Sequence, residues 1–431
     1  MMIRSLLRRA FITRSSARTI SSAPEANTVC VLGKEYKRDD MTNVTPSLLE
    51  KVGRELHNTK DHPINLLKKL IVHHFHKTYI NTAGNPLFTS IENIPPVVTT
   101  EQNFDSLCVA KDHISRSRSD SYYINSETML RTHTSAHQRD FIKMGLDRFL
   151  VTGDVYRRDE IDSTHYPVFH QMEGVRVYLK QNLLPRSKTM FEDGEETDEK
   201  QSRHTLETSK ALELELKTTL ERLVKYIFGE ETQTRWNSCY FPFTHPSFEL
   251  EILFRGEWVE MLGSGIMRQE ILDDAGASFK TGWAFGLGLD RLSMLLFSIP
   301  DIRLLWSKDE RFIDQFKHIT LPMLTKENLN KKDLSFKPFS TFLPRCEDVA
   351  FWITPEFNEN DFHELVRATC GDIVEKVELI DSFENSKTGK VSRCYRLVYR
   401  SMDRAVTKDE VDELHSKLRE NIEKLLPVEL R

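Results

Sequence analysis

Apolar residues repeat at helical spacing in three stretches of the chain. Pro63 suits a first helical turn, and the apolar positions after it predict an amphipathic helix from Pro63 to Tyr79: Ile64, Leu67, Leu70, Ile71 and Phe75. A second helix is expected at about 206–228, and a third begins near Leu289. Each of these helices would bury one face against a core.

A period of two replaces the helical spacing at 248–254. There apolar residues alternate with polar ones: Phe248, Leu250, Ile252 and Phe254. Residues 255–257 then turn the chain into 258–262, which is also strand-like. The pattern predicts an antiparallel hairpin with one face packed on a core.

The last hundred residues follow a different order. We expect a helix at 361–369, strands near 374–382 and 391–400, and a final helix at 408–425. With a first strand before them, these elements fit a ferredoxin-like split β-α-β domain. We therefore predict an α+β protein with a larger domain at 61–320, a linker at 321–337 and a ferredoxin-like domain at 338–431.

Charge is unevenly distributed along the 431 residues. Residues 1–24 contain five arginines and no acid, which is typical of a mitochondrial transit peptide, although a disordered basic tail has a similar composition. The net charge of −5 becomes −10 without those arginines. This excludes a strongly basic coat for nucleic acid and confines any such contact to a local patch.

Two segments look peripheral to a core. Residues 25–60 are polar and irregular, so we expect an extension over the surface. Residues 185–204 contain six acids in the nine positions 191–199, which predicts a solvated, mobile insertion. No stretch approaches the roughly 18 apolar residues of a membrane span, so no membrane contact is expected. The six cysteines form no CxxC pair and are expected to be free, mostly buried thiols in a reducing compartment such as the mitochondrial matrix.

Three clusters of residues could carry chemistry. The first, RTHTSAHQ at 131–138, combines hydroxyl, imidazole and amide groups. His133 and His137 have the spacing of two metal ligands on a helix, but no HExxH arrangement is present, so a polar substrate-binding loop is favoured.

The second cluster is a strand, loop and strand at 153–174. It presents Arg157 on one strand and Gln171 and Glu173 on the other, where a spacing of two puts both side chains on one face. Arginine suits a phosphate or a carboxylate, and the pair could hold an ammonium group. A hairpin with paired surface charges explains the same residues about equally well.

The third cluster, GWAFGLGLDRLSML at 282–295, joins a strand to a helix. It lacks the full G-x-G-x-x-G, so a Rossmann site is disfavoured. Its glycines permit close approach of a ligand to the backbone, and Arg291 supplies positive charge in the first turn of the helix.

Together these segments resemble the class II aminoacyl-tRNA synthetases. Residues 156–159 with Phe169 match the second motif of that family, and 286–291 match the third. The sequences of residues 131–138, 162–174 and 241–247 are similar to those of the phenylalanyl-tRNA synthetases, in their single-chain mitochondrial form. The resemblance covers about 45–431 and implies an antiparallel catalytic sheet flanked by helices, with a C-terminal anticodon-binding domain of ferredoxin-like fold.

The resemblance implies a two-step reaction. Phenylalanine and ATP form phenylalanyl-adenylate, and the phenylalanyl group is then transferred to mitochondrial tRNA(Phe). The two catalytic groups would be Arg157 on the α-phosphate and Arg291 on the γ-phosphate, with Phe169 stacked on adenine. The other expected ATP-binding residues are Asp159, Thr164, His165 and Tyr166. Asp159 stands where the family often has Glu, and Mg²⁺ is an expected cofactor without assigned ligands.

The resemblance also implies a phenylalanine site. Its expected residues are His133, Ser135, His137, Gln138, Gln171, Glu173, Phe241, Phe243, Glu260, Ala284, Phe285 and Gly286. Ser135 would join Gln171 and Glu173 on the α-ammonium group. Phe241 and Phe243, taken as spaced by two on one strand, would meet the substrate ring, although the residues alone favour core packing. Glu260 could serve this site or Mg²⁺.

The tRNA contact is expected in the C-terminal domain. A basic run at 387–408 includes the predicted tRNA-binding residues Arg393, Arg396, Arg400 and Arg404. Tyr395 and Tyr399 are interleaved and could stack on unpaired bases, while the alternative is the solvated face of a strand. The resemblance favours a monomer. Two other functions stay open: a paralogue that binds RNA without catalysis, and a class II ligase for another amino acid.

Overall fold

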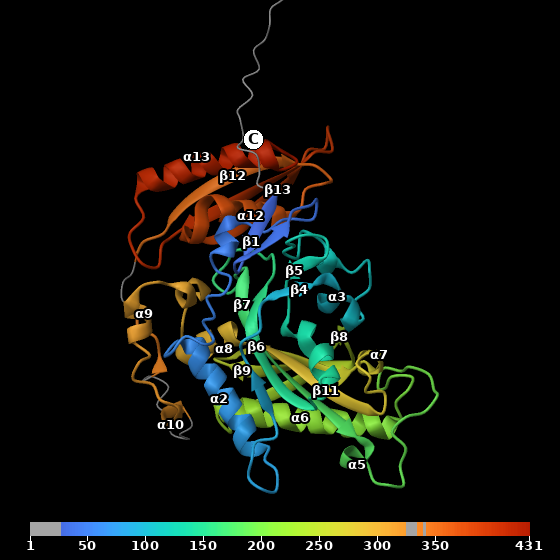
Figure 1. Ribbon diagram of the computed structural model, residues 1–431. Coiled ribbons are helices and arrows are strands. Elements are labelled where there is room, and N and C mark those ends of the chain that lie inside the picture. Colours follow the sequence, from blue (N-terminus) through green and yellow to red (C-terminus); the bar gives the residue numbers. More distant parts are fainter. Residues whose placement is uncertain (1–26, 325–333, 339–341) are drawn as a thin grey trace, which may run out of the picture.

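The computed structural model describes residues 27–324, 334–338 and 342–431 (Figure 1). The expected transit segment at 1–24 lies outside these residues. The described chain folds into a larger domain around a mixed sheet and a C-terminal domain around an antiparallel sheet. Within the described part, no helix is both long and apolar enough to cross a membrane.

The sheet of the larger domain has seven described strands in the order β3-β6-β7-β11-β10-β9-β8. Their bounds are β3 Thr89–Ile91, β6 Arg148–Tyr156, β7 Val168–Leu179, β8 Thr234–Phe241, β9 Thr244–Phe254, β10 Glu257–Met267 and β11 Lys280–Gly288. Neighbours run antiparallel except for β3 and β6. The hairpin expected at 248–262 is confirmed as β9 and β10.

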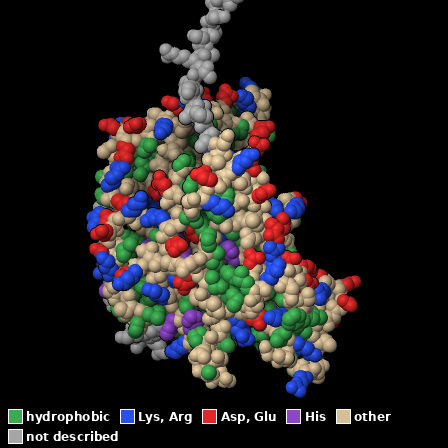
Figure 2. Space-filling model, in the orientation of Figure 1, with side chains coloured by type: hydrophobic (Ala, Val, Ile, Leu, Met, Phe, Trp, Pro, Cys, Tyr) green, Lys and Arg blue, Asp and Glu red, His purple; other side chains and the backbone are tan. Residues whose placement is uncertain are grey.

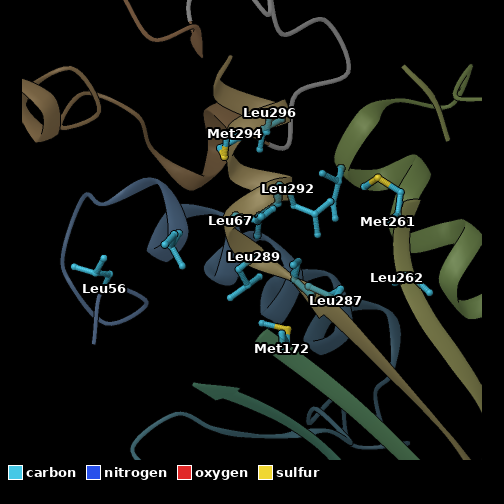
Figure 3. Close-up of a cluster of buried hydrophobic side chains, with 14 of the residues drawn as sticks. Leu56, Leu67, Met172, Met261, Leu262, Leu287, Leu289, Leu292, Met294 and Leu296 are labelled. Carbon is cyan, nitrogen blue, oxygen red and sulfur yellow. The ribbon is translucent and has the colours of Figure 1, made fainter. Parts of the chain in front are cut away.

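Helices cover one face of this sheet. They are α2 (Pro63–Thr78), α6 (Leu206–Phe228) and α8 (Leu289–Phe297), which confirms the three helices expected from the periodicity. The α6 helix begins because the Thr205 side chain accepts from the Thr208 amide, and it ends at Gly229 with φ of 108°. Leucines and methionines from the helices, the sheet and the segment around Leu56 meet in one core (Figure 3).

The other face of the sheet carries shorter elements and the candidate site. They are β4 (Val97–Thr99), α3 (Thr100–Asn103), β5 (Thr128–Leu130), α4 (Gln138–Lys143) and α7 (Gln269–Asp274). A second core joins them to the strands, with Phe104, Val151 and Ile271 all buried. The short helix α5 (Lys180–Leu183) follows β7.

The expectation of an irregular extension at 25–60 is wrong. This segment contains a β-hairpin and a helical turn: β1 (Thr28–Val31), β2 (Lys34–Lys37) and α1 (Pro46–Leu49). Val29, Val31 and Leu48 are buried in the main core. The sequence pattern did not predict these elements because each strand and the helical turn are only four residues long, too short to show a sustained period.

The insertion at 185–204 is only partly as expected. Its acidic residues are exposed, but Met190, Gln201 and His204 are buried against the larger domain. The segment is therefore anchored at its end, and Figure 1 draws it in green between α5 and α6, beside α7.

The C-terminal domain has the expected ferredoxin-like order. Its elements are β12 (Arg345–Ile353), α12 (Glu359–Cys370), β13 (Val374–Glu384), β14 (Val391–Tyr399), α13 (Lys408–Leu425) and β15 (Val428–Leu430), with the strands ordered β13-β14-β12-β15. Before it come α9 (Glu310–Asp314) and α10 (Leu321–Leu324). Within the expected linker, Leu334 and Phe336 pack into the core of the larger domain.

The two domains contact each other through α12 (Figure 1). Arg367 donates to the backbone carbonyl oxygens of Asp159 and Glu160. Arg158 pairs with Asp361 at 2.9 Å. The loop after β6 is thus held by the C-terminal domain.

Candidate active site

One cavity of about 700 Å³ opens on the face of the sheet opposite α6. Its lining includes every residue assigned to ATP or phenylalanine except His137: His133, Ser135, Gln138, Arg157, Asp159, Thr164, His165, Tyr166, Phe169, Gln171, Glu173, Phe241, Phe243, Glu260, Ala284, Phe285, Gly286 and Arg291. The three clusters, separate in sequence, therefore share one cavity.

Arg157 directly follows β6 and is held on two sides. Its Nε donates to the carbonyl oxygen of Thr132 at 2.9 Å, and its guanidinium lies 5.2 Å from the centre of the Phe169 ring. Burial lowers the pKa of the guanidinium, opposed by the nearby carboxylates of Asp159 and Glu260. Arginine remains a cation at neutral pH, so the cavity contains a fixed positive charge suited to a phosphate.

The strand β11 runs directly into α8, and this junction carries Arg291. The preceding Asp290 is buried and accepts from the backbone amide of His170 at 2.5 Å. Because β11 pairs with β7 only as far as Gly288 opposite Gln171, the carboxylate continues the contact between these elements. Asp290 therefore fixes the first turn of α8 against the strand that carries Phe169.

Glu173 is the centre of a polar group at the bottom of the cavity. Its carboxylate accepts from Ser135 Oγ at 2.6 Å and from Gln138 Nε2 at 2.5 Å, and Thr134 Oγ1 lies 3.3 Å away. Burial raises the pKa of Glu173 to about 7, against these hydrogen bonds, which lower it. A buried carboxylate without a cationic partner is matched to a ligand that brings a positive charge.

Aromatic side chains form an apolar wall beside Glu173. Phe241 and Phe243 lie nearly parallel, with ring centres 6.1 Å apart. They are not on one strand as expected, since β8 ends at Phe241 and β9 begins at Thr244. Gly263 is required below them, because a Cβ there would meet the Phe241 ring at 2.6 Å. The cavity thus combines a buried carboxylate, suited to an ammonium group, with an apolar pocket.

Ala284 and Phe285 are adjacent on β11, and their side chains lie on opposite faces of the sheet. Ala284 lies in the core of the site face and also on the cavity lining. The Phe285 ring instead packs in the main core, 5.7 Å from the ring of Phe75 and stacked on it. The ring of Phe285 therefore lies in the main core, although Phe285 remains part of the cavity lining as expected.

Two family models match the chain. The class II core domain of tRNA synthetases (F) matches residues 43–192 and 205–316, and the ferredoxin-fold anticodon-binding domain matches 340–431. The mitochondrial phenylalanine–tRNA ligase of Mus musculus is 49% identical over 423 residues, which are 97% of this chain and 92% of that protein. The chain belongs to the phenylalanine–tRNA ligases of class II.

Other relatives in this ligase family match the chain over a similar extent. The chloroplastic/mitochondrial phenylalanine–tRNA ligase of Arabidopsis thaliana is 46% identical, with 96% of this chain and 88% of that protein covered. The mitochondrial phenylalanine–tRNA ligase of Saccharomyces cerevisiae is 40% identical, with coverage of 99% and 100%. The likeness therefore spans both domains.

His137 does not reach the cavity of this ligase. Its Nε2 faces Nη1 of Arg131 at 3.0 Å, and burial lowers the pKa of His137 to about 3, so the neutral ring accepts from the guanidinium. Arg131 is fully buried and pairs with Asp154 at 2.8 Å. Sequence reasoning missed this pair, although Arg131 begins the RTHTSAHQ cluster and a charge there signals a specific partner.

One group among the described residues has metal-ligand geometry, namely Glu160, Asp162 and His165. His165 Nδ1 lies 2.7 Å from Asp162 Oδ2, and this contact raises the pKa of His165. These residues satisfy one another without an ion. A second set of oxygen donors lies on the site face of β9 and β10. Burial raises the pKa of Glu249 there, and the nearby carboxylates of Glu260 and Glu251 raise it further. The carboxylate oxygens of Glu260 and Glu249 are ligands of the kind that a divalent cation such as Mg²⁺ prefers, whereas Glu251 already pairs with Arg235.

The predicted tRNA-binding arginines are each paired with a carboxylate in the described C-terminal domain. The pairs are Arg393 with Glu359, Arg396 with Asp348, Arg400 with Glu375 and Arg404 with Glu410. Figure 2 shows the resulting mixture of basic and acidic side chains over this domain. Tyr395 and Tyr399 are 1% and 0% exposed, so the expectation that they stack on bases is wrong.

Proposed function

We propose that this chain activates phenylalanine with ATP and attaches it to mitochondrial tRNA(Phe) in the mitochondrial matrix. The observation that carries the proposal is the cavity in which Arg157, the Glu173 group and an apolar aromatic wall meet. A phosphate, an ammonium group and a phenyl ring are the three parts that a phenylalanyl-adenylate presents together.

In the first step, a carboxylate oxygen of phenylalanine attacks the α-phosphorus of ATP. The new P–O bond forms the adenylate, and the bond to the β-phosphate oxygen breaks to release pyrophosphate. Arg157, held by Thr132, stabilises the charge that grows on the α-phosphate. Arg291 binds the γ-phosphate and Phe169 stacks on adenine, while Asp159, Thr164, His165 and Tyr166 surround the nucleotide from the loop after β6.

Phenylalanine is oriented by its ammonium group. The N–H groups of the ammonium donate to ionised Glu173, to Ser135 Oγ and to the side-chain oxygen of Gln171. Ser135 and Gln138 in turn donate to the Glu173 carboxylate and keep it in place. His133 lies on the carboxylate side of the substrate. Phe241, Phe243 and Ala284 enclose the ring. Positioning is the main source of rate here, since no covalent enzyme intermediate is needed.

Mg²⁺ would be held by Glu260 and Glu249, and when bound it neutralises charge on the phosphate groups. The protein's own groups leave this charge only partly compensated, since Arg157 and Arg291 are the cationic side chains assigned to the phosphates. We therefore expect activation to require a divalent cation that prefers oxygen ligands.

In the second step, a hydroxyl of the terminal tRNA ribose attacks the adenylate carbonyl. The ester forms, AMP leaves, and the hydroxyl proton leaves with the phosphate. The C-terminal domain binds the anticodon region through exposed arginines such as Arg396, which is 45% exposed at its side chain. One chain carries both domains, which supports a monomer.

The decisive measurement is phenylalanine-dependent exchange of pyrophosphate into ATP by the purified chain, followed by aminoacylation of tRNA(Phe). We expect exchange with phenylalanine and not with the other standard amino acids, apart from slow exchange with tyrosine. Exchange with a different amino acid would assign another ligase activity. Absence of exchange, with tRNA binding retained, would indicate an RNA-binding paralogue.

A further inference from the structure

The insertion between α5 and α6 contains residues that the family model leaves unmatched, from 193 to 204. Its acidic part is exposed, yet Gln201 is 3% exposed and His204 is fully buried. Burial of polar side chains is unusual unless they make defined contacts. The contacts of Gln201 reach backbone next to residues that line the amino-acid pocket.

The ladder between β9 and β10 is irregular where it reaches the pocket. From Gly265 to Met267 the pairing advances two residues on β10, but from Ser247 to Thr244 it advances three on β9. Such a bulge leaves backbone groups without a partner in the ladder. A buried carbonyl oxygen in that position costs free energy unless another group donates to it.

Gln201 supplies the missing partners. Its Nε2 donates to the carbonyl oxygen of His245 at 2.8 Å and to that of Met267 at 2.9 Å. Its Oε1 accepts from the backbone amide of Gln269 at 2.8 Å. One side chain thus ties together the start of β9, the end of β10 and the start of α7.

The same backbone carries the wall of the pocket. The carbonyl oxygen of Phe243 accepts from the Arg268 amide at 3.0 Å, and Thr244 is paired with Met267. Gly265 packs so closely here that a Cβ would meet the Thr244 side chain at 2.6 Å. A shift of Met267 or His245 would therefore move Phe243 and Thr244, which line the cavity.

Two further contacts hold the insertion to this place. His204 Nε2 lies 2.9 Å from Gln269 Oε1 and 3.2 Å from Thr281 Oγ1. The side chain of Arg268, whose amide supports Phe243, pairs with Glu196 at 2.5 Å. The insertion is therefore attached to the larger domain on both sides of Gln201, which holds the Gln201 side chain against the bulge.

We propose that Gln201 is a positioning residue for the amino-acid pocket, which sets substrate discrimination by holding the Phe243–Thr244 wall in place. The inference rests on the proposed function, because that function makes this wall part of a phenylalanine site. It adds to that function a role for a segment outside the family's common core.

The test compares Gln201→Met with the parent chain in phenylalanine-dependent pyrophosphate exchange. Methionine keeps the length and volume of the side chain and removes its three hydrogen bonds. We expect KM for phenylalanine to rise roughly tenfold, the factor expected when buried backbone groups lose their partners. KM for ATP should stay within about twofold, because Arg157 and Phe169 do not contact this backbone.

The second measurement is discrimination between phenylalanine and tyrosine. The ratio of kcat/KM for phenylalanine to kcat/KM for tyrosine should fall in Gln201→Met, since a loosened wall admits a larger ring. The matched control is Glu195→Gln, an exposed change in the same insertion, which should leave both KM values and the ratio unchanged. Calorimetric titration with phenylalanine alone measures the same loss of affinity without turnover.

Three results would overturn the inference. They are equal changes in both KM values, an unchanged discrimination ratio, or a lowered melting temperature with an unchanged KM for phenylalanine. If Gln201→Met fails to fold, Gln201→Glu, which keeps the acceptor and removes both donor bonds, is measured in its place. Failure of the parent chain itself to exchange would contradict the proposed function, and the calorimetric titration separates that outcome from this one.

Discussion

The carbonyl oxygen of Thr132 accepts a hydrogen bond from Nε of Arg157 at 2.9 Å. Asn103 fixes this part of the chain, because its Oδ1 accepts from the Thr132 amide and its Nδ2 donates to Thr132 Oγ1, both at 3.0 Å. Asn103 is fully buried. With Nε engaged in this way, the two Nη groups of Arg157 could serve the α-phosphate contact that we propose for it.

Replacing Asn103 should therefore weaken activation through Arg157. In Asn103→Ala the Thr132 amide is left buried without its partner, which costs about 1–3 kcal/mol. We expect kcat of pyrophosphate exchange to fall roughly tenfold or more. Asn103→Asp keeps the acceptor for the Thr132 amide and should retain more activity. An unchanged kcat in Asn103→Ala would show that Arg157 does not depend on this contact.

Phenylalanine binding should depend on pH through Glu173. Its pKa of about 7 in the ligand-free protein means that only the ionised form is ready for an ammonium group. KM for phenylalanine should rise as the pH falls below about 7, approaching tenfold per pH unit. Glu173→Gln should bind phenylalanine weakly and lose this dependence. A wild-type KM that stays constant between about pH 6 and about pH 8 would contradict the assignment.

The same raised pKa predicts a trend in stability. Glu173 favours folding as the neutral acid, so its contribution is complete below the ordinary value of 4.5 and is lost as the pH rises through about 7. Glu173→Gln removes the ionisation and should flatten this part of the profile. Denaturant unfolding of the ligand-free protein at several pH values measures the difference, and parallel profiles would contradict it.

Ala284 should limit the size of the substrate ring. It lies on β11 opposite Gly265 and is 4% exposed on the cavity lining. Ala284→Gly removes one methyl group and should relax discrimination against para-substituted phenylalanines by about tenfold, whereas Ala284→Ser should preserve it. The ratio of kcat/KM for phenylalanine and para-chlorophenylalanine is the measurement. Equal ratios in all three proteins would place the ring elsewhere.

Arg393 and Arg396 should behave differently although both were predicted to contact tRNA. Arg393 lies on the helix side of its sheet and contacts Glu359 and Tyr395. Arg396 pairs with Asp348 on the open face. Arg396→Ala should weaken tRNA binding and reduce its salt slope by about one, while pyrophosphate exchange is unchanged. Arg393→Ala should lower the melting temperature and leave the slope unchanged. Identical slopes in both variants would contradict this division.

The sequence by itself determined the chemistry and the local elements of this protein. Pro63 with the spacing after it predicted α2, and the glycines before Arg291 predicted a strand that passes directly into a helix. These features depend on neighbours a few residues away, which a pattern records directly. The residue types at 157, 173 and 291 likewise suit phosphate and ammonium ligands through the charge of their side chains alone.

Only the tertiary structure decided which side chains face the cavity. Both faces of the central sheet are buried, so alternation could not distinguish Ala284, on the cavity, from Phe285, in the core. His137 is turned away by Arg131, and Gln201 meets Met267 across 66 positions of sequence. Such contacts join segments that come together only on folding, and their geometry depends on the packing of the whole domain.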